Sequence, residues 1–99
     1  MVVKHVFSFD VSPEKVPAYM EFSAKIAKPF FEKWPEISSY DVFQTVVGRP
    51  VFTKEIVYKD MDAFSKAQAK LGDSEAQKVA GEFFSYTKNL ESKLIIEVV

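Results

Sequence analysis

The chain has 99 residues, the size of one domain, and its 13 basic and 14 acidic residues almost cancel. With Arg49 as its only arginine and no basic cluster, the sequence argues against a nucleic acid as partner. It has no cysteine, no apolar run near the roughly 18 residues of a membrane span and no signal-peptide layout, which favours a cytoplasmic protein without disulfides or thiolate metal sites.

Residues 2–11 alternate with the period of a β-strand. One face is the more apolar and is predicted to meet helices: Val3, His5, Phe7, Phe9 and Val11. The other face mixes small, apolar and polar side chains, as expected of a surface that meets a second copy of the chain: Val2, Lys4, Val6, Ser8 and Asp10.

A helical stretch is predicted to follow, with Ser12 as N-cap and Pro13 at its first position. Its apolar residues recur at helical spacing as far as Phe31. Pro29 removes a backbone donor inside the stretch, so we expect a kink or a restart there. Pro35 is predicted to close it.

Residues 38–47 and 51–59 are predicted to be two strands. Only Gly48-Arg49-Pro50 separates them, and so short a connection favours an antiparallel hairpin. Glu55 stands mid-strand and is expected to join a cross-strand or interface ion pair.

The second helical stretch is predicted to begin at Asp60 or Asp62 and to break at Gly72. Ser74 with Gln77 three residues later has the pattern of a capping box, which predicts a second helical segment that reaches Leu90. Lys93 to Val99 is predicted to be the last strand.

Each half therefore reads as strand, helical stretch and strand. This order predicts an α+β fold over residues 1–99, namely a ferredoxin-like β-α-β-β-α-β unit with an antiparallel four-stranded sheet. Two helical stretches cover only one sheet face, so we expect the other to be covered by a second copy in a homodimer. Assembly beyond the dimer is left open.

Three segments carry a resemblance to a known family: 1–6, 34–40 and 55–64. They resemble the dimeric α/β-barrel superfamily, and most of all its stress-responsive proteins, a group that includes a polyketide cyclase. The resemblance implies a homodimer whose two sheets close into a dimeric α+β barrel, with an apolar pocket near the first-strand histidine. In the cyclase-like members a second histidine completes the site, whereas residues 71–77 here contain none.

His5, the only histidine, is the candidate general base, because the ordinary pKa of histidine suits proton transfer near neutral pH. The alternative is a core imidazole bonded to a backbone carbonyl or a tyrosine. Tyr58 and Tyr86 are candidate donors to a substrate carbonyl or developing enolate, or else tyrosines with a structural partner. One histidine is too few for a metal site, and no glycine-rich phosphate loop is present.

Five phenylalanines are candidates to line a pocket for an aromatic substrate, although such residues also serve as plain core: Phe7, Phe9, Phe43, Phe64 and Phe83. The sequence thus predicts a protein that binds a hydrophobic, aromatic or polyketide-like small molecule. Any chemistry would be cofactor-independent cyclisation or proton transfer with His5 as base. The alternatives are a non-enzymatic stress-associated or assembly protein and a cofactorless monooxygenase.

Overall fold

The computed structural model describes residues 1–99, and its elements follow the predicted order. They are β1 (Val3–Val11), a 3₁₀ turn (Pro13–Lys15), α1 (Val16–Phe22), a π-helical turn (Ser23–Ala27), α2 (Lys28–Glu32), β2 (Ile37–Gln44), β3 (Phe52–Tyr58), α3 (Met61–Lys70), α4 (Ser74–Tyr86) and β4 (Thr87–Ile96). The strands form one antiparallel sheet in the order β2-β3-β1-β4, which confirms the ferredoxin-like prediction. None of the helices is both long and apolar enough to span a membrane.

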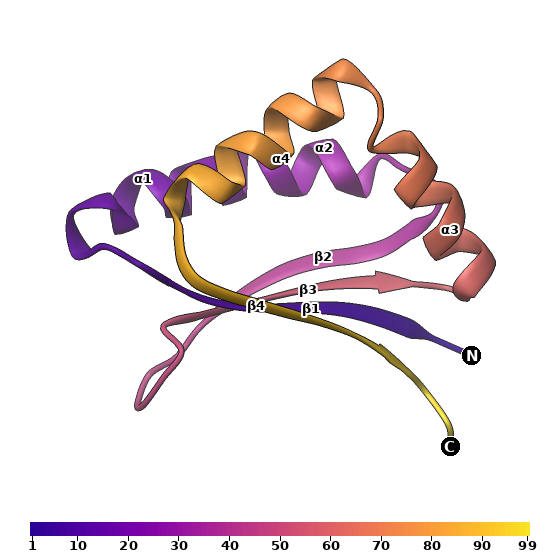
Figure 1. The fold of residues 1–99 in the computed structure, drawn as a ribbon, viewed down its shortest axis with the longest axis horizontal. Helices are drawn as coiled ribbons and strands as arrows, with labels where there is room; N and C mark the ends of the chain where they lie inside the picture. The colour runs from indigo at the N-terminus through magenta and orange to yellow at the C-terminus, as the bar shows by residue number, and fades with distance from the viewer.

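The helices lie over one face of the sheet, and the opposite face carries none (Figure 1). The side chains of Val3, Phe9 and Val11 on β1 are buried beneath these helices, as the alternation predicted. On the open face, the Lys4 ammonium lies 3.4 Å from the Glu55 carboxylate, which confirms the cross-strand ion pair.

The first helical stretch passes through Pro29 without ending. A π-helical turn at Ser23–Ala27 precedes α2, and Pro29 occupies the first turn of α2. In the turn before it the Lys28 N–H donates to the Ser23 carbonyl five residues back, and this wider register accommodates the proline within a continuous helical stretch. The predicted restart therefore takes the form of a change in hydrogen-bond register, and Ser12 stands at the N-cap of the 3₁₀ turn without a side-chain bond.

The second helical stretch begins with the Asp60 carboxylate as its cap and breaks at Gly72, as predicted. The prediction of Ser74 as the next N-cap is wrong, because Asp73 is the cap. Its carboxylate accepts hydrogen bonds from two backbone N–H groups of the first turn, at 3.1 and 3.3 Å. A charged carboxylate at this position also interacts favourably with the helix dipole, which a serine hydroxyl does not.

Two strand boundaries differ from the prediction. The hairpin strands end at Gln44 and restart at Phe52, so the connection is longer than three residues. The last helix ends at Tyr86 instead of Leu90, and β4 starts at Thr87. From Thr87 onwards the chain pairs with β1, and these long-range hydrogen bonds outweigh a local helical pattern.

The core at one end of the sheet consists of aromatic rings. The ring centroid of Phe9 lies 5.2 Å from Phe83, 5.6 Å from Tyr19 and 5.9 Å from Phe52. Most of these pairs are edge-to-face, the arrangement that aromatic quadrupoles favour.

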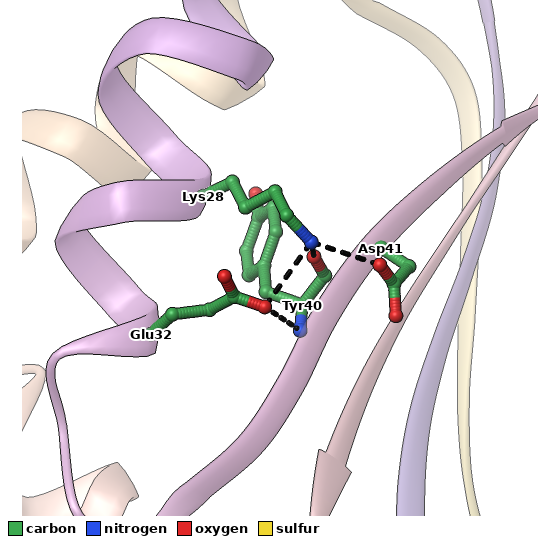
Figure 2. A network of polar contacts seen from close by, with 4 residues as sticks. All are labelled: Lys28, Glu32, Tyr40 and Asp41. Atoms are coloured by element: carbon green, nitrogen blue, oxygen red, sulfur yellow. Dashed lines mark hydrogen bonds and ion pairs between the residues drawn. The ribbon is translucent and has the colours of Figure 1, made fainter.

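A polar network ties α2 to the edge strand β2 (Figure 2). The Lys28 ammonium donates to the Tyr40 carbonyl at 2.7 Å, to Asp41 at 2.9 Å and to Glu32 at 3.1 Å. Glu32 also accepts the Tyr40 backbone N–H at 3.1 Å, so it occupies a donor that an edge strand would otherwise leave unpaired. The network fixes the position of Tyr40 beneath α2.

Candidate functional site

A cavity of about 350 Å³ lies between the sheet and the helices. All four strands contribute to its wall, together with α2, α3 and α4. Fifteen of its 19 wall residues are hydrophobic; the polar ones are His5, Lys54, Gln68 and Ser92. This composition, an apolar surface with few polar groups, is that of a small-molecule site.

His5 reaches the cavity from the helix-covered face of β1. Its ring centroid lies 4.1 Å from that of Phe7 and 6.0 Å from that of Phe64. Burial lowers the pKa of the imidazole, and the positive charge of Lys54 lowers it further. The ring is therefore neutral at pH 7 and able to accept a proton.

Lys54 is the unexpected member of the site. Its side chain is only 5% exposed, and its ammonium lies 3.4 Å from the ring centroid of Phe83 and 4.1 Å from that of Phe7. Tyr40 adds a third ring at 5.4 Å. None of the molecule's six ion pairs involves Lys54, and burial lowers its pKa to about 7.

Sequence reasoning missed Lys54, although a signal was present. Phe52, Lys54, Ile56 and Tyr58 alternate along β3, and all four are buried on the helix-covered face. A lysine at a position where the strand alternation calls for an apolar residue indicates a buried charge. Its approach to Phe7 also depends on the sheet register, which places the two residues opposite each other.

Two of the residues counted as hydrophobic are tyrosines, Tyr40 and Tyr58, which add phenol hydroxyls to the wall. Burial raises the pKa of Tyr58 to about 12, so its phenol stays protonated and able to donate near neutral pH. The pKa of Tyr40 is also raised, mainly by burial, and further by the neighbouring Tyr19 and Tyr58.

The structure brings four of the predicted site residues together in the cavity wall: His5, Tyr58, Phe7 and Phe83. Phe64 lies next to them without lining the cavity. Its ring packs edge-on against Tyr58 at 5.2 Å and against His5 at 6.0 Å.

The other three predicted residues lie elsewhere. Phe9 is completely buried in the aromatic core, and Phe43 is 53% exposed on the open face of the sheet. Tyr86 packs 5.7 Å from the ring of Tyr19, and its hydroxyl contacts Glu82 on its own helix. Its pKa is raised, first by desolvation and then by Glu82.

No protein-family model matches the sequence, and no curated protein matches it either. Solved structures are similar in fold. A variant of SnoaB, a cofactor-independent oxygenase from Streptomyces nogalater, superposes with a TM-score of 0.77 at 20% identity, over 97% of this chain and 92% of that one. An ethyl tert-butyl ether d family protein from Bacillus halodurans C-125 gives 0.72 at 21% identity, over 99% and 100%.

An antibiotic biosynthesis monooxygenase superposes over the full length of both chains, with a TM-score of 0.75 at 13% identity. A conserved protein from Methanosarcina mazei Go1 gives 0.77 at 17% identity, over 96% of this chain and 91% of that one. These likenesses concern the fold, and they agree with the four-stranded antiparallel sheet covered on one face. The chain therefore has a ferredoxin-like fold, and the solved structures with this fold include the oxygenase SnoaB and an antibiotic biosynthesis monooxygenase.

Proposed function

We propose that the protein binds a hydrophobic aromatic or polyketide-like molecule in this cavity and catalyses cofactor-independent proton transfer on it. The observation that carries the proposal is His5, a neutral imidazole with no hydrogen-bond partner, in the wall of an apolar cavity. The non-enzymatic alternative expects a packed and hydrogen-bonded histidine, so the unpartnered ring favours chemistry.

In the proposed reaction His5 takes a proton from a carbon next to a substrate carbonyl. The electron pair of the broken C–H bond moves into the carbonyl, which becomes an enolate oxygen. Tyr58 is the candidate donor to that oxygen, because its phenol keeps its proton at neutral pH. The protonated imidazole then returns the proton, and the apolar wall keeps water away from the enolate.

The size of the cavity supports a substrate of one or two rings. About 350 Å³ lies at the lower end of the range of small-molecule pockets, roughly 300–1,000 Å³. Trp34 and Phe31 of the wall add aromatic surface that such a ligand can contact.

We expect His5→Gln to slow hydrogen exchange in an aromatic ketone by about 100-fold or more, since a general base contributes 10²–10⁴-fold. The assay follows deuterium incorporation into 2-tetralone by NMR, with the uncatalysed rate subtracted. Glutamine keeps a polar side chain of similar length but has no basic nitrogen. The wild-type rate should level off by pH 7, because the pKa of His5 lies below its ordinary value of 6.5. Wild-type exchange no faster than the buffer rate would refute the proposal.

A cofactorless monooxygenase is the second candidate, favoured by the likeness in fold to SnoaB, which is a cofactor-independent oxygenase. In that reaction molecular oxygen is the oxidant and an electron-rich ring supplies the electrons. Oxygen uptake with a panel of quinols, measured for wild type and His5→Gln, distinguishes it from proton transfer alone.

We also propose that the open sheet face pairs with a second copy of the chain. Phe43 on β2 and Ile95 on β4 are large apolar residues of this face, with 53% and 43% of their surface exposed, and no helix covers them (Figure 1).

Ile95→Lys is therefore expected to convert a dimer into a monomer, because it places two uncompensated charges in the interface. Sedimentation equilibrium measures the mass across a range of concentrations. Val46→Lys is the matched control, since Val46 is 96% exposed in the β2–β3 connection. A wild type that is monomeric at high concentration would contradict the dimer.

A further inference from the structure

Lys54 is a buried amine without a counterion. The cavity wall contains no aspartate or glutamate, and the molecule's six ion pairs all lie elsewhere. The faces of Phe83, Phe7 and Tyr40 attract an ammonium group but accept no conventional hydrogen bond from it. A buried charge is costly unless it is both paired and hydrogen-bonded, so the chain leaves this charge uncompensated.

We propose that the natural ligand is an aromatic anion, a carboxylate or an acidic phenol, whose charged oxygen pairs with the Lys54 ammonium inside the cavity. This inference rests on the proposed function, because it names the substrate class of the same cavity. It adds a positioning role for Lys54. The anion is anchored at one point of the wall, and the rest of the ligand lies among the rings, within reach of His5.

The packing around Lys54 suits such a role. Its amine lies against two phenylalanine rings that come from different elements, Phe7 on β1 and Phe83 on α4. The ammonium is thus held in place before a ligand arrives, and little side-chain entropy is lost on binding. A carboxylate that enters this apolar space gains a charge-assisted hydrogen bond in a medium of low dielectric constant.

The groups that face this space determine how binding depends on pH. They are His5 from β1, Tyr40 from β2 and Tyr58 from β3, with the uncharged Gln68 from α3 and Ser92 from β4; α2 and α4 contribute no ionisable group. Both tyrosines stay protonated below pH 10, because burial raises their pKa. Protonation of Lys54 and protonation of His5 both strengthen the binding of an anion, so the affinity falls as the pH rises.

The test compares 2-naphthoate with its neutral isostere 2-naphthamide by isothermal titration calorimetry. At pH 6.5 we expect the wild type to bind the acid at least tenfold more tightly than the amide. Lys54→Met should remove this preference while it retains binding of the amide, and His5→Gln should keep the preference. Circular dichroism establishes that both variants are folded.

A second measurement needs no variant. Above about pH 7.5 the affinity of the wild type for naphthoate should fall about tenfold per pH unit, because Lys54 must then take up a proton to pair with the ligand. The affinity for the amide should stay constant. Titrations in two buffers of different ionisation enthalpy report this proton uptake directly.

The outcomes separate the two proposals. Equal binding of acid and amide, or a preference for the acid that survives in Lys54→Met, overturns the anion site and leaves the ligand cavity in place. If neither compound binds, both the anion site and the ligand cavity are overturned.

Discussion

Lys54→Met should raise the free energy of unfolding at pH 6 by several kcal/mol. Burial lowers the pKa of Lys54 from its ordinary 10.5 to about 7, so keeping the charge in the folded protein costs on the order of 4–5 kcal/mol. Methionine has a similar length and no charge, and it fits among the rings that surround the amine. Replacing a buried charge with an apolar side chain of similar volume is often stabilising.

The sign of the pH dependence follows from the same shift. Between about pH 7 and pH 10.5 the unfolded chain binds the lysine proton and the folded protein does not, so wild-type stability rises with pH across this window. Below pH 7 the full cost is present in the wild type. Lys54→Met should lack this rise.

Urea unfolding at pH 6, 8 and 9.5 measures both effects. Lys78→Met, at an exposed position of α4, is the control and should change little. Equal stabilities of wild type and Lys54→Met at pH 6 would show that the charge carries no cost in the fold. If the variant is more stable, the buried amine lowers the stability of the wild type. Such a loss of stability is common where a residue serves function.

Phe9→Ala should lower the free energy of unfolding by about 3–5 kcal/mol, the range for truncation of a buried phenylalanine. The side chain is completely buried, and three rings surround it within 6 Å. These neighbours belong to three different elements, so they are poorly placed to collapse into the space left behind. Such a loss is a large part of the roughly 5–15 kcal/mol by which a typical domain is stable.

Phe7→Ala is the matched comparison on the same strand face. Phe7 already borders the cavity, so its truncation enlarges an existing space and should cost less stability. Ligand binding should depend on Phe7 and not on Phe9. To keep the protein folded, this comparison uses the milder Phe9→Leu, which should leave the thermal shift produced by 2-naphthamide unchanged, whereas Phe7→Ala should reduce it. A reduced shift in Phe9→Leu would place Phe9 in the ligand site, as first predicted.

Most of the fold was predictable because its signals are local. Strand alternation and helical spacing are set by the geometry of each element, and Gly72 marks a break that any packing would keep. The end of α4 was not predictable. Residues 87–90 continue a helical pattern, yet they belong to β4, whose Thr87 and Lys88 pair with residues of β1 almost 80 positions away in the sequence.

The candidate site was likewise predictable only in part. His5, Tyr58, Phe7 and Phe83 were predicted from residue type and from their place on a strand or helical stretch, and all four line the cavity. Phe9 and Phe43 have the same residue type, but one is sealed in the core and the other lies on the open face.

The sequence by itself determined the order of the elements, the helix-covered face of β1 and the single histidine upon it. Only the tertiary structure decided where the packing leaves a cavity and which charge borders it. Cavities arise from the fit between elements distant in sequence, and Lys54 meets Phe83 only when α4 lies across the sheet. Periodicity can assign a residue to a face, but it cannot show which neighbours that face will have.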